Sequence, residues 1–225
     1  MARHERLQTL TTMMRVGVVP VFYSPDLEVA KNVAAACAKG GCPLLEFTNR
    51  GDHAWEVFTA LESFCAKQHP DLILGVGSVV DPHTAALYIN CGANFVVGPV
   101  LNAEVGKLCN RRKVPYSPGC GSASEVSAAE ELGCEIVKIF PGAEVGGPGF
   151  VKNLLGPCPW SKIMPTGGVE ATEESLGAWF KAGVACVGMG SNLITKEMLK
   201  AKDYAGIAEN VRRTVALIAG IRGKR

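Results

Sequence analysis

Residues 16–22 form the run Val-Gly-Val-Val-Pro-Val-Phe, a continuous apolar stretch of the length of one β-strand. Runs of this kind are typical of strands buried on both faces in a parallel sheet. The turn Ser24-Pro25-Asp26 follows, and residues 27–39 form an alanine-rich segment that ends at Gly40-Gly41. Because aspartate favours helix starts and glycine favours helix ends, the region predicts a strand, a helix and a second strand over 44–48.

The same alternation repeats along the chain, and a glycine near 41, 92, 133 and 183 marks the end of a helix before the next strand. Strands are predicted at 16–22, 44–48, 72–76, 94–97, 114–117, 134–140, 162–166 and 185–188. Helices are predicted near 3–14, 27–39, 53–68, 82–90, 102–111, 122–132, 150–155, 173–182, 192–200 and 204–220.

Eight strand–helix units in 225 residues are the number expected for a (β/α)8 TIM barrel. We therefore predict an α/β protein with a single barrel domain over residues 1–225 and an extra N-terminal helix. The alternative is a doubly wound open sheet, which is less favoured because no G-x-G-x-x-G turn follows the first strand.

Composition excludes several classes of function. The formal net charge of +2 gives no reason to expect nucleic-acid binding, and no apolar run is long enough for a membrane helix. The nine cysteines are scattered without a C-x-x-C pair or a histidine cluster, so we expect no metal site and a reducing, cytoplasmic location. The basic C-terminus, residues 222–225, is predicted to fray.

A lysine interrupts the apolar strand Glu135-Ile-Val-Lys-Ile-Phe-Pro141. Alternation places Lys138 on the same face as Ile136 and Phe140, where burial would lower the pKa of its ammonium group. An unprotonated amine can attack a ketone to form a Schiff base. The alternative is an edge-strand lysine whose side chain extends to water.

Other chemically useful side chains fall at the carboxyl ends of the predicted strands, where active sites of such barrels lie. Glu46 and Arg50 share one face at the end of the second strand while the chain stays extended, and Ser78 follows the third. Thr166 precedes a glycine-rich turn after the seventh strand, and a second such turn follows the eighth. Turns of this type can hold a phosphate through backbone N–H groups and the N-terminus of the following helix.

Each of these residues also has a structural explanation. Glu46 and Arg50 could form an ion pair, and Ser78 and Thr166 could bond their own backbone in turns. The glycines could serve only the sharpness of the turns. The joint presence of a carboxylate, an arginine, a lysine and two phosphate-type turns at one rim favours an active site.

With these residues in place, the chain resembles the class I aldolases that cleave 2-keto-3-deoxy-6-phosphogluconate (KDPG) and 4-hydroxy-2-oxoglutarate (KHG). The resemblance extends over nearly the whole chain. It rests on the segments 18–21, 45–50, 75–79, 97–99, 116–119, 137–141, 165–169 and 188–191. It implies a retro-aldol reaction that needs no metal or other cofactor and yields pyruvate and an aldehyde.

The resemblance also implies roles for individual residues. Lys138 would form the imine, and Glu46 would be the general acid and base. Arg50, assisted by Ser78, would hold the substrate carboxylate, and Thr166 would contact polar groups near the scissile bond. Pro99 and Phe140 would form walls of the pocket. The distal phosphate would be bound by Gly167, Gly168, Gly190 and Ser191.

Several positions depart from the pattern of the family. Ser78 stands where threonine is common, Met189 replaces a glycine, and the loop 142–149 differs in a way that could alter the choice of substrate. Two other functions stay open: a phosphosugar isomerase, epimerase or synthase with Glu46 as its base, and a non-catalytic phosphometabolite-binding barrel. By resemblance, the protein is expected to be a homotrimer that acts on a small 2-keto acid.

Overall fold

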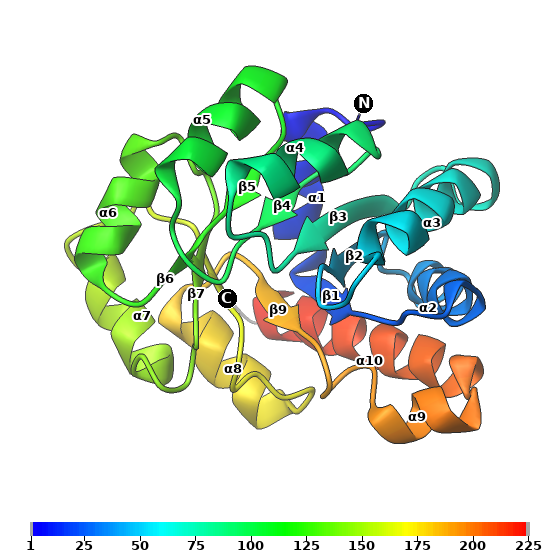
Figure 1. The fold of residues 1–225 in the computed structure, drawn as a ribbon. Helices are drawn as coiled ribbons and strands as arrows, with labels where there is room; N and C mark the ends of the chain where they lie inside the picture. The colour runs from blue at the N-terminus through cyan, green and yellow to red at the C-terminus, as the bar shows by residue number, and fades with distance from the viewer. Residues whose placement is uncertain (1, 224–225) are drawn as a thin grey trace.

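The computed structural model describes residues 2–223, and short parallel strands enclosed by helices lie at its centre (Figure 1). The strands are Val18–Phe22 (β1), Leu44–Thr48 (β2), Ile73–Gly77 (β3), Val96–Val97 (β4), Tyr116–Ser117 (β5), Gly119–Cys120 (β6), Val137–Ile139 (β7), Ile163–Pro165 (β8) and Val187–Met189 (β9). The helices are Arg6–Val16 (α1), Leu27–Lys39 (α2), Ala54–Gln68 (α3), Pro82–Asn90 (α4), Ala103–Arg112 (α5), Ala123–Glu131 (α6), Gly147–Leu155 (α7), Glu173–Ala182 (α8), Lys196–Ala201 (α9) and Tyr204–Gly223 (α10).

All strand pairs are parallel, and the strands form a curled sheet in two parts. One part has the order β5-β4-β3-β2-β1-β9 and the other has the order β6-β7-β8. A bridge between Thr166 and Gly188 connects the end of β8 to β9, and β5 and β6 lie on either side of Pro118. Proline has no N–H to donate to the ladder, which explains why the strand predicted at 114–117 is followed by a separate short strand.

The strands are buried on both faces, as the apolar runs predicted. Every residue of β2 and of β3 is buried. Phe47 packs edge-on against Phe22, Tyr23 and Phe58, between the sheet and α3. A polar side chain in the middle of such a strand therefore loses its contact with water.

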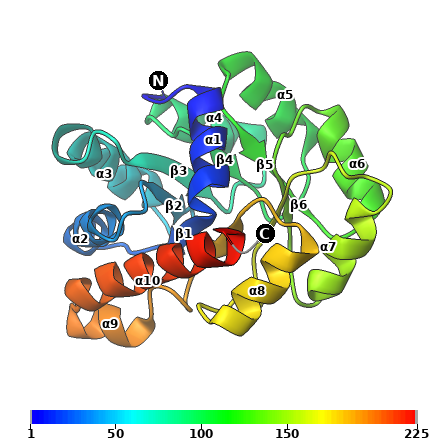
Figure 2. The same ribbon diagram turned by 180° about the vertical axis from the view of Figure 1, so that it is seen from behind.

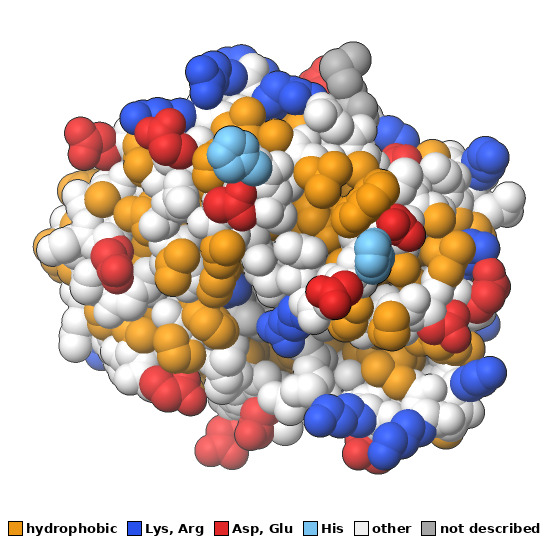
Figure 3. Space-filling view, viewed as in Figure 1, with side chains coloured by type: hydrophobic (Ala, Val, Ile, Leu, Met, Phe, Trp, Pro, Cys, Tyr) orange, Lys and Arg blue, Asp and Glu red, His pale blue; other side chains and the backbone are white. Residues whose placement is uncertain are grey.

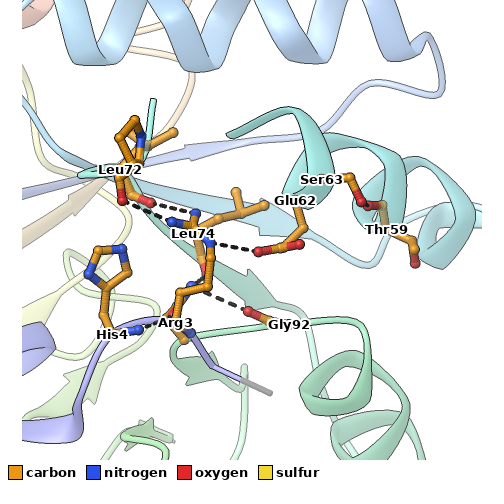
Figure 4. A network of polar contacts seen from close by, with 10 residues as sticks. Arg3, His4, Thr59, Glu62, Ser63, Leu72, Leu74 and Gly92 are labelled. Carbon is orange, nitrogen blue, oxygen red and sulfur yellow. Dashed lines mark hydrogen bonds and ion pairs between the residues drawn. The ribbon is translucent and has the colours of Figure 1, made fainter. Parts of the chain in front are cut away.

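Helix α1 lies across the strands on the side seen in Figure 2, and the segment before it is bonded into the body of the protein. Asn94 Oδ1 accepts hydrogen bonds from the backbone N–H groups of Arg3 and His4, at 2.8 and 2.9 Å. The Arg3 guanidinium donates to Glu62 at 2.7 Å and to the carbonyls of Pro70 and Leu72 (Figure 4). This extra N-terminal helix was predicted, although it begins three residues later than expected.

Several predicted elements have other bounds in the structure. The strands predicted over 94–97 and 114–117 begin two residues later, and the helix predicted over 192–200 begins at Lys196. The strand predicted over 134–140 covers only Val137–Ile139, and the helix predicted over 150–155 begins at Gly147. The prediction that the C-terminus frays is wrong at Arg222, which lies in α10. Its guanidinium donates to the carbonyls of Met14 and Ala185 and stacks on the Phe180 ring. Residues 224 and 225 of that prediction lie outside the described part.

No helix within residues 2–223 is long and apolar enough to span a bilayer.

Candidate active site

Lys138 and Glu46 lie in the interior on two different parts of the curled sheet. Glu46 is the middle residue of β2 and is 2% exposed; Lys138 is the middle residue of β7 and is 6% exposed. Both strands are apolar on either side of the charged residue, so ordinary strand alternation carries each side chain into the interior. The predicted burial of Lys138 is confirmed.

Burial lowers the pKa of Lys138 below its usual range. Loss of hydration is the largest cause, and the neighbouring positive charge of Arg50 acts in the same direction. The negative charge of Glu46 opposes the shift. The ammonium nitrogen lies 4.5 Å from the centre of the Phe140 ring, on the apolar face that the sequence predicted. The result is an amine that loses its proton more readily than a surface lysine.

The Glu46 carboxyl group has the opposite shift, because burial raises its pKa above its usual range. The charges of Lys138 and Arg50 lower the pKa, but they do not outweigh desolvation. Oxygen Oε2 of Glu46 is buried and accepts no hydrogen bond from residues 2–223. A β-carbon at Gly77 would collide with the other carboxyl oxygen, so glycine is required there for the carboxyl to occupy its position.

Arg50 follows β2 and is exposed, and its Nε donates to the Ser78 hydroxyl at 3.4 Å. Ser78 has a φ of 61°, a left-handed conformation that is uncommon for residues other than glycine. The structural alternatives for this pair are not supported. Within the described residues Arg50 forms no ion pair with Glu46, and Ser78 bonds a side chain and not its own backbone.

A cavity of about 450 Å³ opens at the carboxyl ends of β1, β2, β8 and β9. Thr48, Arg50 and Phe140 line one part of it, and the two glycine-rich turns line another. The hydroxyl of Thr166 also faces this cavity and has no partner among residues 2–223. A β-carbon at Gly188 would collide with that hydroxyl, which explains the glycine in β9.

All four predicted phosphate-binding residues line this cavity: Gly167, Gly168, Gly190 and Ser191. The first two have φ angles of 91° and 70°, a left-handed conformation that favours glycine. The side-chain amide of Asn192 donates to the Val169 carbonyl at 2.9 Å and joins the two turns. Their arrangement can therefore present several N–H donors to one anion.

Lys138, Glu46, Ser78 and Pro99 do not line this cavity. The first two are buried beside it, behind residues such as Phe140, and Ser78 reaches it only through Arg50. The backbone of Pro99 lies against Gly119, the neighbour of Lys138 in β6. The active site predicted at the strand ends is thus a cavity with the buried pair Lys138 and Glu46 beside it.

The sequence analysis missed several lining residues, among them Tyr23, Asn192 and Lys196. Tyr23 directly follows β1, so its position at a strand end was an available signal. Asn192 and Lys196 come after the second glycine-rich turn, and nothing in their spacing indicates that the chain folds back to the cavity there.

Within residues 2–223, no group of three or more histidine, cysteine or acidic residues could hold a metal ion. The side chains that meet here suit a different chemistry. An amine with a lowered pKa can act as a nucleophile, a carboxyl with a raised pKa can exchange protons near neutrality, and an arginine can bind a carboxylate.

Comparisons with known proteins agree with this chemistry. The sequence profile described as "KDPG and KHG aldolase" matches residues 10–210. A KHG/KDPG aldolase from Escherichia coli is 32% identical over 88% of this chain and 90% of its own length. A 2-dehydro-3-deoxy-phosphogluconate aldolase from Haemophilus influenzae is 29% identical over 94% of this chain and 97% of its own.

Solved structures give the same result. The crystal structure of a KDPG aldolase from Legionella pneumophila superimposes with a TM-score of 0.83 at 29% identity, over 92% of this chain and 98% of that one. That protein was captured with pyruvate as a covalent carbinolamine intermediate.

Proposed function

Because this chain belongs to the KDPG and KHG aldolase family, we propose that it cleaves a 2-keto-3-deoxy sugar acid to pyruvate and an aldehyde through a Schiff base on Lys138. The enzyme is an aldolase, a lyase that breaks a carbon–carbon bond. The substrates proposed are KDPG, KHG or both, with glyceraldehyde 3-phosphate or glyoxylate as the aldehyde. The observation that carries the proposal is the buried amine of Lys138, with a lowered pKa, close to the carboxyl group of Glu46.

Imine formation begins with the neutral amine of Lys138. Its lone pair attacks the C2 carbonyl carbon, and the carbonyl oxygen takes a proton from the Glu46 carboxyl to give a carbinolamine. Proton transfers through Glu46 then release this oxygen as water and leave an iminium ion. Burial favours the starting protonation state, because it raises the pKa of Glu46 and lowers that of Lys138.

Bond cleavage uses the iminium as an electron sink. The Glu46 carboxylate takes the proton of the C4 hydroxyl, the electron pair of the C3–C4 bond forms the enamine, and the aldehyde leaves. Protonation at C3 by Glu46 and addition of water to the iminium release pyruvate and restore the amine. Each step is balanced by these two residues and water, so we expect no metal or other cofactor.

The remaining residues are proposed to bind and orient the substrate. Arg50 holds the carboxylate, and its hydrogen bond to Ser78 limits the positions the guanidinium can take. Thr166 contacts the polar groups near the scissile bond with its unpartnered hydroxyl. The distal phosphate is bound by Gly167, Gly168, Gly190 and Ser191, while Phe140 limits the pocket.

Three features of the whole molecule complete the proposal. The two parts of the sheet would act as one closed (β/α)8 barrel in a single domain, with support from the bridge between Thr166 and Gly188. A homotrimer would cover exposed apolar side chains such as Trp55, Val80 and Leu87, and Figure 3 shows apolar side chains over α4. A cytoplasmic location agrees with nine cysteines that are all free thiols.

Reduction with borohydride in the presence of pyruvate tests the mechanism. Wild-type protein is incubated with pyruvate and NaBH₄, digested and analysed by mass spectrometry, and the reduced pyruvyl group is expected on Lys138. The Lys138→Met variant should take up no label, whereas Lys162→Met, which changes an exposed lysine beside β8, should be labelled like the wild type.

An unlabelled wild-type protein that is folded, assayed beside a working control aldolase, would refute the imine mechanism. It would favour an isomerase or epimerase in which Glu46 acts as a base without an imine. Label on another lysine would instead refute the assignment of Lys138.

A further inference from the structure

The cavity contains two cationic side chains and no acidic one among its lining residues. Arg50 comes from the end of β2, and Lys196 is the first residue of α9, after β9. Strand β1 lies between β2 and β9, so the two cations approach the cavity from different sides. Arg50 has the proposed role of binding the substrate carboxylate, and nothing yet described uses Lys196.

Lys196 is free to bind a ligand. Its side chain is exposed, and within the described residues it forms neither an ion pair nor a hydrogen bond. The nearest acid in sequence, Glu197, is not part of the cavity lining. Two other lysines are paired along their own helix, Lys31 with Glu28 and Lys107 with Glu104.

The wall beside Lys196 is rich in unused donors. The backbone N–H groups of Gly168, Ser191 and Asn192 donate to no acceptor within residues 2–223. The Asn192 side-chain amide is fixed by its hydrogen bond to the Val169 carbonyl, and this bond connects the two turns. The Asn192 side chain is therefore not available as an acceptor for these backbone N–H groups. Neutral N–H donors bind an anion, and a nearby ammonium makes the site select by charge.

Charge selection matters because substrates of this reaction can share the same reacting end and differ at the far end. A phosphate carries close to two negative charges at neutral pH, whereas a hydroxyl carries none. Backbone N–H groups can donate hydrogen bonds to the oxygens of both groups. A lysine ammonium, with its compact charge, adds attraction only for the charged one.

We propose that Lys196 determines specificity in this enzyme by binding the distal phosphate of the substrate, so that a phosphorylated 2-keto acid is preferred over the same acid ending in a hydroxyl. The inference rests on the proposed aldolase function and extends it to the substrate class. Lys196 contacts the substrate far from the bond that breaks. Its contribution is therefore to binding, and we expect it in KM and not in kcat.

The test compares two substrates in three variants. KM and kcat are measured with 2-keto-3-deoxy-6-phosphogluconate and with unphosphorylated 2-keto-3-deoxygluconate. In Lys196→Met, KM for the phosphorylated substrate should rise about tenfold, while KM for the other substrate changes less than about twofold. Lys196→Arg should recover most of the loss, since it restores the charge. Lys200→Met, on the same helix but outside the cavity, is the matched control and should behave like the wild type.

Inorganic phosphate gives a second readout. It should inhibit the wild type competitively against the phosphorylated substrate, and about tenfold more phosphate should be needed for Lys196→Met. An equal rise of KM for both substrates, or no rise at all, would overturn the inference.

Pyruvate trapping separates this result from a failure of the proposed function. Pyruvate has no distal group, so borohydride should label Lys138 in Lys196→Met as in the wild type. If pyruvate labels Lys138 but the substrate preference is unchanged in Lys196→Met, only the role of Lys196 is wrong. If pyruvate labels no lysine in the wild type, the aldolase mechanism itself fails.

Discussion

Asn94 and Glu46 are both polar side chains buried in the interior, at 0% and 2% exposure, but they differ in their hydrogen bonding. Asn94 accepts from the backbone of Arg3 and His4 and donates to the carbonyls of Leu74 and Gly92. The Glu46 carboxyl group forms no hydrogen bond within residues 2–223, and its oxygen Oε2 is completely buried. The Asn94 amide is fully bonded, whereas the Glu46 carboxyl group has no hydrogen-bond partner among residues 2–223.

The difference separates residues that stabilise this protein from residues that act on a substrate. An unsatisfied buried polar group costs about 1–3 kcal/mol, so a fold keeps one only where something else requires it. Around Asn94 the network fixes the segment before α1. Around Glu46 the same kind of burial holds a carboxyl and an amine at shifted pKa values. We therefore expect substitutions to affect activity in one region and stability in the other.

The largest effect on activity is expected for Lys138→Met. Without the nucleophile, kcat/KM should fall by roughly 10⁴-fold or more. Stability should instead rise, by about 0.5–2 kcal/mol near neutral pH, because a poorly hydrated amine is replaced by an apolar side chain. The pKa of Lys138 is lower in the folded state, so its charged form penalises folding at low pH. The gain should thus shrink as pH rises toward the usual lysine pKa.

Urea unfolding of the wild type and Lys138→Met at several pH values measures the difference in their free energies of unfolding. A variant that loses both activity and stability would contradict the comparison, since it would make Lys138 a structural residue.

Glu46→Gln should reduce kcat by about 10²- to 10⁴-fold, the range expected for loss of a general acid and base. Burial raises the pKa of Glu46, and cleavage needs its carboxylate form. Wild-type kcat should therefore rise as pH increases through that raised pKa, and this rise should be absent in Glu46→Gln. Measuring kcat of both proteins from pH 4 to 9 tests this prediction. An unchanged pH profile in Glu46→Gln would show that another group moves the proton.

Gly188→Ala should have an intermediate effect on activity. The added methyl group collides with the Thr166 hydroxyl, and displacement of that group should lower kcat/KM about tenfold. Gly177→Ala in α8 is the control, because a β-carbon there meets nothing within 4 Å. Thr166→Val should reproduce the loss, and the double variant should be little worse than either single one. Additive losses would mean that Gly188 acts by another route.

Much of the fold could be predicted where short-range signals determine the ends of elements. Helices α2, α4 and α8 have the bounds predicted for them, and each begins at a side chain that accepts backbone N–H groups: Asp26, Asp81 and Thr172. Helix α7 has no such cap, and its first turn contains glycine and proline, so its start could not be predicted from local preferences.

The chemistry of the site was also predictable in part. For Lys138, alternation places the side chain on the apolar face with Ile136 and Phe140, which predicts its burial, whereas Glu46 was predicted only at a strand end. The pairing of Arg50 with Ser78 was implied only by the family resemblance, and in the structure the two side chains meet at the ends of the adjacent strands β2 and β3. Lys196 could not be predicted, because its position depends on how the chain folds back after β9. Such a return depends on packing between distant segments, which no short stretch of sequence encodes.

The smallest effect on activity is expected at the other end of the comparison, for Arg3→Met. The Arg3 side chain donates to Glu62 and to the carbonyls of Pro70 and Leu72, and its removal leaves Glu62 and those carbonyls without their partner. The free energy of unfolding should fall by about 1–3 kcal/mol, while kcat/KM at 25 °C stays within about twofold of the wild type. Lys31→Met removes a largely exposed ion pair with Glu28 and should change stability by less than about 0.5 kcal/mol. Chemical denaturation and the aldol assay on the same preparations measure both quantities. A loss of activity in folded Arg3→Met would mean that the two regions are coupled, and the division drawn between Asn94 and Glu46 would fail.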